Sequence, residues 1–212
     1  IDLTRGSGAA RAWLDVVQGQ AQGATADIRL QNVELTAGAG LPPLALRTVS
    51  GRVGARQLAD GGTELSTQAL QFETEDHLRW PGGNLMLRQW AANGRNAARG
   101  ELVADRLDLA AVHALAQRLP VGDAVQKTLN QMAPQGLVDS VQGKWSGPVA
   151  HPSTFALKGR VSGLAIAAVR EVGRERPGVQ GLQADFDVTE AGGTAQLVLD
   201  KGVLDAQGLL DD

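Results

Sequence analysis

The sequence predicts a mostly β protein built as a long, curved antiparallel sheet that forms a groove, with one helical hairpin inserted near residues 108–134. Three observations predict this class. Apolar and polar residues alternate with a period of two along most of the chain, as they do in half-buried strands. Turn signals rich in Gly, Pro, Asn and Asp recur at regular intervals, which is typical of an antiparallel meander. The 27 glycines are about twice the usual share and favour many turns and strand bends.

The N-terminal half of the predicted sheet contains two changes of phase. Residues 27–35 alternate until Asn32, where the pattern slips by one position, and residues 65–72 show a second slip. A slip of one residue turns the other face of a strand inward, so we expect a bulge or a tight turn at each place. The Asp-Gly-Gly sequence at 60–62 predicts a hairpin turn, and residues 85–90 predict a strand that alternates without interruption.

The clearest hairpin lies near the C-terminus. Two alternating runs, 184–188 and 195–199, flank a Glu-Ala-Gly-Gly turn at 190–193. Asp185 and Asp187 fall on one side of the first run. We interpret them as the solvated face of the hairpin, because no apolar pocket that would raise a carboxyl pKa is evident beside them.

One segment breaks the strand pattern. Asp108 can cap a helix whose apolar positions follow helical spacing as far as Leu119. The Pro-Val-Gly sequence at 120–122 interrupts this helix, and Asp123 can cap a second helix that Pro134 ends. Each helix has a single apolar stripe, so we expect both to lie on the sheet or at the mouth of a groove.

The predicted parts form a single continuous unit. A β-meander over residues 1–107 leads into the helical hairpin over 108–134, and a second β-meander over 135–212 continues the same sheet. The chain opens with Ile-Asp-Leu-Thr at 1–4 and has no initiator Met, so we expect it to be a fragment of a larger protein.

Composition and motifs argue against catalysis and nucleic-acid binding. A net charge of −3 with acids and bases interspersed does not provide the basic face of a nucleic-acid binder. The absence of cysteine excludes disulfides, thiolate nucleophiles and cysteine-based zinc sites. His77, His113 and His151 show no metal-ligand spacing, and Gly6-Ser7-Gly8 is interpreted as a linker because it lacks the Lys and Ser/Thr of a phosphate loop. We therefore predict that the protein is not an enzyme and has no catalytic residues, no cofactor and no metal.

An apolar sheet surface is the remaining functional feature. If the sheet curls without closing, small aliphatic residues would line a smooth channel that suits acyl chains, which are flexible and offer no hydrogen bonds. The alternation selects eight candidate lining residues: Ile28, Leu30, Leu85, Leu87, Leu157, Val161, Phe186 and Leu197. The alternative, which composition alone favours, is that these residues close into a sandwich or barrel core. The protein would then be a structural or adhesive scaffold module of the cell envelope.

Three stretches carry a resemblance to a known family. Residues 79–85 read Arg-Trp-Pro-Gly-Gly-Asn-Leu and lead into a strand. Residues 100–109 read Gly-Glu-Leu-Val-Ala-Asp-Arg-Leu-Asp-Leu and run directly into the predicted helix. Pro-Gln-Gly-Leu-Val at 134–138 then precedes Trp-Ser-Gly-Pro at 145–148. In this order they resemble the central part of the YhdP-type proteins of the AsmA-like superfamily, over roughly residues 79–165.

The resemblance implies a fold and a function. Proteins of this family are long Gram-negative envelope proteins, held in the inner membrane by one N-terminal helix with the bulk in the periplasm. Their elongated β-rich trough is thought to let phospholipids slide towards the outer membrane. This chain would be an internal segment of such a lipid-transport bridge. Its expected partners are phospholipid acyl chains, neighbouring segments of the same long chain and, through an N-terminal anchor absent from this chain, the inner membrane; nucleic acid is not expected.

Overall fold

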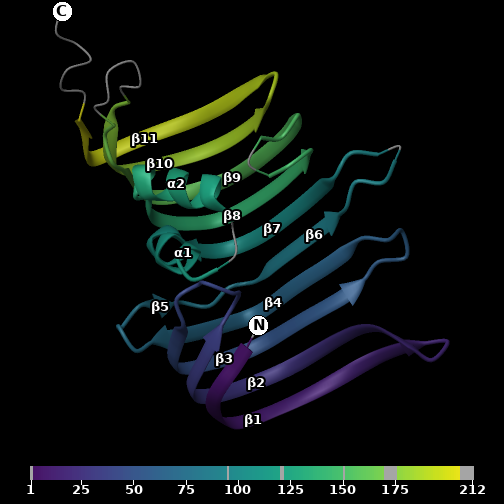
Figure 1. The fold of residues 1–212 in the computed structure, drawn as a ribbon. Coiled ribbons are helices and arrows are strands. Elements are labelled where there is room, and N and C mark those ends of the chain that lie inside the picture. The colour runs from purple at the N-terminus through teal and green to yellow at the C-terminus, as the bar shows by residue number, and fades with distance from the viewer. Residues whose placement is uncertain (1, 95, 120–121, 150, 170–175, 206–212) are drawn as a thin grey trace, which may run out of the picture.

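The computed structural model describes residues 2–94, 96–119, 122–149, 151–169 and 176–205, most of which form one antiparallel sheet of eleven strands (Figure 1). The strands are β1 (Asp2–Val17), β2 (Gln20–Thr36), β3 (Leu44–Gln57), β4 (Thr63–Thr74), β5 (Arg79–Trp80), β6 (Leu85–Trp90), β7 (Arg99–Asp108), β8 (Gln135–Ser146), β9 (Thr154–Ile166), β10 (Gly178–Thr189) and β11 (Gly192–Asp205). Two helices, α1 (Leu109–Ala116) and α2 (Asp123–Met132), connect β7 to β8. Pro120 and Val121, predicted to interrupt the helical pair, and residues 206–212 of the second predicted meander lie outside the described residues.

The strands follow one another in the sheet in chain order. That order is β1-β2-β3-β4-β6-β7-β8-β9-β10-β11, and the short β5 pairs with β4. Strands that are adjacent in sequence therefore pair in space, as is usual for antiparallel strands joined by short turns. Because β1 and β11 form the two opposite edges, the sheet is open. The predicted fold class is confirmed, and the closed core expected under the scaffold alternative is wrong for this sheet.

Hairpin turns connect the strands at the end of the sheet opposite the helices (Figure 1). Gln18 and Gly19, between β1 and β2, have φ values of 51° and 78°. Positive φ at both central residues defines a type I′ turn, whose twist matches that of the flanking strands. At the predicted turn 60–62, the Leu58 backbone N–H donates to the Gly62 carbonyl at 2.7 Å, which closes the connection between β3 and β4.

The interpretation of Gly6-Ser7-Gly8 as a linker is wrong, because these residues lie inside β1. Among the strands that the structure describes, β1 pairs with β2 only, and its side chains are exposed along the whole strand. Gly8 has a φ of 141°, and a Cβ atom at this position would lie 2.2 Å from the carbonyl oxygen of Arg29. Glycine is therefore needed here because the two backbones approach each other closely.

A line of unusual backbone conformations crosses the sheet and bends it. Six strands contain, inside extended backbone, one residue whose φ lies between 47° and 77°: Asn32 in β2, Ala69 in β4, Arg106 in β7, Gly163 in β9, Gly181 in β10 and Lys201 in β11. Figure 1 shows the strands turning near this level. The phase changes predicted at Asn32 and within 65–72 are confirmed as part of this line. We call the part of each strand between the bend and the hairpin turns the long arm, and the remainder the short arm.

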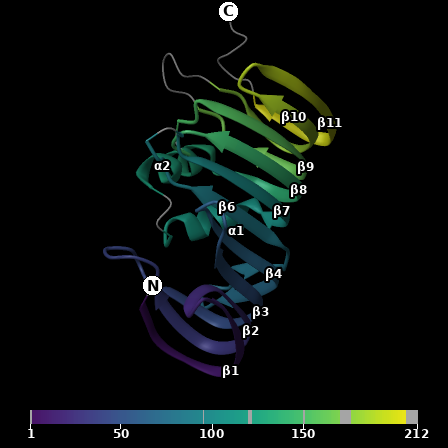
Figure 2. The ribbon, with the colours of Figure 1, turned by 90° about the vertical axis from the view of Figure 1, so that its right-hand side faces the viewer.

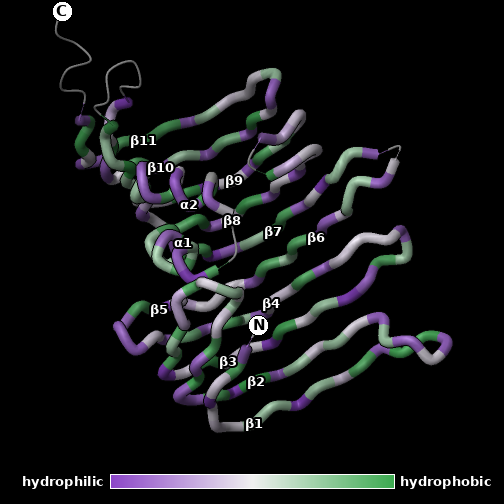
Figure 3. The backbone as a smooth tube through the Cα atoms, in the orientation of Figure 1, coloured by the Kyte–Doolittle hydropathy of each residue, from purple (hydrophilic) through white to green (hydrophobic). Residues whose placement is uncertain are grey.

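The long arms have two chemically different faces. Directly opposed residues of antiparallel strands lie on the same face, so the pairings trace each face through the sheet. One face, which we call the apolar face, includes a row formed by Val53, Thr67, Leu85, Ala104, Val141, Gly159 and Phe186. The alternate residues form the opposite side, the charged face, and every charged side chain that the structure describes in the long arms belongs to it. Figure 3 shows the resulting alternation of hydrophobic and hydrophilic residues along the strands.

Both helices lie on the same side of the sheet (Figure 2), and α1 packs on the inside of the bend. Asp108 caps α1 as predicted, since its Oδ1 accepts a hydrogen bond from the Ala111 backbone N–H at 3.0 Å. Leu115 of α1 joins a cluster of buried residues from both sides of the bend: Val33, Leu44, Leu46 and Val49, with Ile28 and Leu30 packed against it. Leu109 packs against a second cluster: Ala104, Val138, Val141, Val161 and Ala184. Neither described helix has the length and hydropathy that crossing a bilayer requires.

Candidate functional site

The eight residues selected from the alternation all lie on the apolar face. They belong to β2 (Ile28 and Leu30), β6 (Leu85 and Leu87), β9 (Leu157 and Val161), β10 (Phe186) and β11 (Leu197). Val161 is 5% exposed and belongs to the cluster beneath Leu109, whereas Leu197 on the edge strand is 61% exposed. The other six are half-buried. Their contact with acyl chains stays a prediction.

One row of the apolar face carries an apolar residue or glycine on every strand that it crosses. Each member lies directly opposite the next, from β1 to β11: Leu14, Ala24, Ala55, Leu65, Leu87, Leu102, Gly143, Leu157, Val188 and Gly193. We call this set the outer row. Neighbouring strands are about 4.8 Å apart, so the row runs roughly 43 Å across the sheet.

Several members of the outer row were not among the residues selected from the sequence. Leu65 is 48% exposed, and Leu102 and Val188 are half-buried, so all three offer apolar surface to a ligand. The hairpin turn at 60–62 was the signal that could have found Leu65. Counting outward from this turn places Leu65 opposite Ala55, but the alternation alone leaves open which side of β4 belongs to the apolar face.

Side chains of neighbouring strands cover the glycines of the apolar face. A Cβ atom at Gly143 would lie 3.3 Å from Cδ1 of Leu157. At Gly159, in the adjacent row, it would lie 2.8 Å from Cζ of Phe186. A large side chain of the neighbouring strand thus lies over each glycine, which has no side chain of its own. The apolar surface therefore continues across both glycines.

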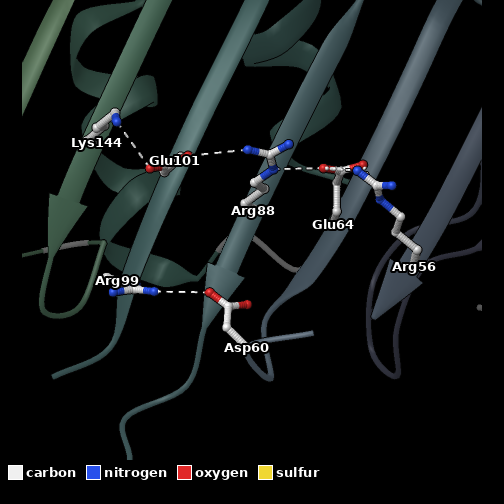
Figure 4. Close-up of polar contacts among 7 residues, drawn as sticks. All are labelled: Arg56, Asp60, Glu64, Arg88, Arg99, Glu101 and Lys144. Atoms are coloured by element: carbon white, nitrogen blue, oxygen red, sulfur yellow. Dashed lines mark hydrogen bonds and ion pairs between the residues drawn. The ribbon is translucent and has the colours of Figure 1, made fainter. Parts of the chain in front are cut away.

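A chain of ion pairs crosses the charged face directly behind the outer row (Figure 4). Glu64 accepts hydrogen bonds from Nε of Arg56 at 2.8 Å and from Nε of Arg88 at 2.7 Å. Glu101 lies 3.7 Å from Nη1 of Arg88 and 3.2 Å from Nζ of Lys144. These five residues, which we call the ion-pair ladder, each neighbour an outer-row residue in sequence. The ladder and the outer row therefore depend on the same strand register.

Glu64 is the least exposed member of the ion-pair ladder, with 8% of its surface accessible. The hydrogen bond from Arg56 is the main cause that holds the pKa of Glu64 below its usual value. Burial acts in the opposite direction, and the hydrogen bond from Arg88 lowers the pKa further. The carboxylate is therefore ionised at neutral pH and links three strands.

A second polar network holds the bend. Oδ1 and Oδ2 of Asp105 accept hydrogen bonds from the backbone and side-chain N–H groups of Asn84, at 2.7 and 2.9 Å. Oδ1 of Asn84 accepts a hydrogen bond from the backbone N–H of the bend residue Ala69 at 3.1 Å. The bonds from Asn84 lower the pKa of Asp105. This network ties β4 and β7 to Asn84, the residue that precedes β6, where the strands change direction.

Asp185 and Asp187 of the C-terminal hairpin are paired with basic residues of β9. Nε of Arg160 lies 2.6 Å from Asp185, and Nζ of Lys158 lies 3.3 Å from Asp187. Both aspartates are exposed, which confirms their assignment to the solvated face. An open depression of about 930 Å³ lies over these two pairs, but its acids and bases neutralise one another and offer no net charge to a ligand.

The three histidines lie apart from one another. Nε2 of His113 is 3.0 Å from Oδ1 of Asn130, and Nδ1 of His77 is 3.5 Å from the carboxylate of Glu73. His151 is exposed. In the part of the chain that the structure describes, no three residues of the types His, Cys, Asp and Glu are grouped so that they could hold a metal ion.

Comparison with known proteins places the chain in a family. A family model described as YhdP protein matches residues 1–212. No curated protein and no solved structure matches the chain. The family match extends beyond the three stretches that carry the resemblance in the sequence, and it confirms that resemblance.

Proposed function

Because the chain belongs to the YhdP family, whose members are envelope proteins related to lipid transport, we propose that it is a segment of a periplasmic lipid-transport bridge. In this proposal the apolar face holds phospholipid acyl chains between the inner and the outer membrane. The lipid head groups stay on the open, hydrated side. The role is passive and non-enzymatic, and the direction of transport is set elsewhere.

The outer row is the observation that carries the proposal. A hydrocarbon chain that moves along this row meets an apolar residue or glycine on each of ten successive strands. Burying apolar surface contributes about 25 cal/mol per Å². Since small and medium aliphatic residues supply this surface throughout the row, the free energy of the bound chain changes little from strand to strand. Such a surface retains a lipid without fixing it at one position.

The two sheet edges provide the expected contacts with neighbouring segments of the same long chain. β1 and β11 are 16 and 14 residues long, and among the described strands each pairs on one side only. Their free backbone groups can pair with further strands, which would extend the outer row. In the full-length protein, we expect an N-terminal anchor to hold this assembly in the inner membrane.

Lipid extraction from the full chain, followed by mass spectrometry, tests the proposal. We expect phospholipid to copurify with the protein, and Leu87→Asp to reduce the bound amount at least tenfold, because it places a charge in the outer row. The matched control is Met86→Asp, on the charged face of the same strand and also half-buried. We expect it to retain lipid.

Two outcomes would contradict the proposal: a wild-type protein without copurifying phospholipid, or equal lipid loss in the two variants while both stay folded. Val161→Asp is unsuitable for this test. Val161 is 5% exposed, so a charge there would destabilise the protein whether or not it binds lipid.

A further inference from the structure

We infer that α1 fills the inside of the bend and thereby confines acyl chains to the outer row. This inference rests on the proposed function, because it specifies which part of the apolar face the lipid uses. The whole apolar face would otherwise be available, from the bend to the hairpin turns. α1 covers the part of this face at the bend, and polar residues lie near the hairpin turns, so the outer row between them is the part left for an acyl chain.

The inside of the bend is already filled by protein. Leu115 is 8% exposed and packs with Leu46 and Val49, which are 5% and 7% exposed. At the other end of α1, Leu109 packs against the cluster that contains Val161. α1 thus covers apolar residues on both halves of the sheet, and an acyl chain could reach them only by displacing the helix.

Polar contacts hold α1 in this position. Nη2 of Arg118, which follows the helix, lies 2.9 Å from Oδ2 of Asp76 in the loop between β4 and β5. Nε2 of Gln126 in α2 donates to the carbonyl of Ala116 at 2.9 Å. Together with the Asp108 cap, these contacts fix both ends of α1.

The outer row remains accessible beyond α1. Leu65 is 48% exposed, and Leu87, Leu102 and Leu157 are half-buried. The next row of the same face, closer to the hairpin turns, is polar on β3, β4 and β6. Its residues there are Gln57, Thr63 and Gln89, which lie opposite one another and are exposed. Alternate residues of a strand are about 7 Å apart, so the accessible strip is narrow.

The absence of charged side chains from the outer row identifies its ligand as an alkyl chain. In the long arms, every described charged side chain lies on the charged face, so an uncharged, flexible chain is the complement of the outer row. The exposed amides of Gln57 and Gln89 can donate and accept hydrogen bonds. Because α1 closes the opposite side, the geometry assigns the polar head group to the side of these glutamines.

Site-specific photocrosslinking in the full chain tests the inference. A photoreactive amino acid is placed singly at Leu102 or Leu157 in the outer row, at Leu30 or Leu164 inside the bend, and at Val103 on the charged face. Each protein is mixed with vesicles of phosphatidylethanolamine and phosphatidylglycerol and irradiated. We expect lipid adducts at the two outer-row positions to exceed those inside the bend at least tenfold. Val103, which follows Leu102 and is 40% exposed, is the matched control and should give background adducts only.

The outcomes separate this inference from the proposed function. Adducts inside the bend that equal or exceed those of the outer row would overturn the confinement by α1 and leave lipid binding intact. Background adducts at all four apolar positions would overturn both. Circular dichroism of each labelled protein checks that the substitution has not unfolded the sheet.

Discussion

Glu64 shows how one residue links several strands of this sheet. Its side chain is 10% exposed and accepts hydrogen bonds from Arg56 and Arg88 on the two neighbouring strands. A hydrogen bond to a charged group contributes about 1.5–3 kcal/mol, less where water competes for it. We expect Glu64→Ala to lower the free energy of unfolding by about 1–3 kcal/mol, as measured by urea denaturation. Asp27→Ala, which removes an exposed pair with Arg52, is the control and should cost less. Equal losses would contradict a special role for Glu64.

The same carboxylate predicts a dependence of stability on pH. Arg56 and Arg88 depress the pKa of folded Glu64 below its ordinary value of 4.5. A depressed pKa gives stability that is present above the unfolded pKa and is lost as the pH falls through the folded pKa. The difference in unfolding free energy between the wild type and Glu64→Gln should therefore be constant above about pH 5.5 and shrink below about pH 4.5. Urea titrations at pH values above and below both limits measure it, and a difference that grows in acid would refute this assignment.

Ala69 has a conformation that suits glycine better than alanine. Its φ is 47°, and the left-handed region costs an L-residue about 1–2 kcal/mol. Glycine avoids this cost but loses about 0.5–1 kcal/mol through its freedom in the unfolded chain. We expect Ala69→Gly to raise the free energy of unfolding by about 0.5–1 kcal/mol. Ala24→Gly, in extended backbone, should lower it, and thermal unfolding of both variants distinguishes the signs.

Among the elements, α1 packs on β2 and β3 through Leu115. Leu115 is 8% exposed within the cluster of β2 and β3. Shortening a buried leucine to alanine typically costs about 2–5 kcal/mol. We therefore expect Leu115→Ala to lower the free energy of unfolding by about 2–3 kcal/mol and to speed hydrogen exchange in α1. The half-buried Leu129 of α2 is the control, and Leu129→Ala should cost less.

The elements themselves were largely predictable from the sequence, because each short turn and each alternation is a local signal. The Asp108 cap predicted α1, and the phase slip at Asn32 predicted part of the bend. The first half of β1 was not recognised as a strand. An edge strand is exposed on both faces, so its sequence does not need to alternate between apolar and polar residues. Gly6-Ser7-Gly8 consequently resembles a linker, although Gly8 is required by the close approach of β2.

The candidate site was only partly predictable, since it depends on register between distant residues. Leu87 and Leu157 were selected from local alternation, but Leu102 and Val188 join them only once the pairing of the strands is known. The ion-pair ladder could not be anticipated either. Glu64 and Arg88 are separated by 24 positions, and nothing in their local sequence marks them as partners.

At the scale of the whole molecule, the open edges predict self-association of the 212-residue chain when it is isolated. Residues such as Val198 on β11 are exposed beside unpaired backbone groups. A charged residue on an edge strand opposes pairing with another edge. We expect sedimentation velocity to show dimers or larger species that Val198→Lys reduces. Val103→Lys, on the same face of a central strand, is the control and should leave association unchanged.

The chain-order topology has a consequence for how such a protein can vary in span. Every described strand of the main path pairs with its neighbours in that path, and β4 pairs in addition with the short β5. Inserting or deleting one two-stranded hairpin would therefore change the length of the sheet across its strands by about 10 Å. Each later strand would keep its apolar residues on the same face. Adding a single strand would reverse the direction of everything that follows. The length of the sheet can thus change in steps of two strands without any change in the pairing of the strands already present.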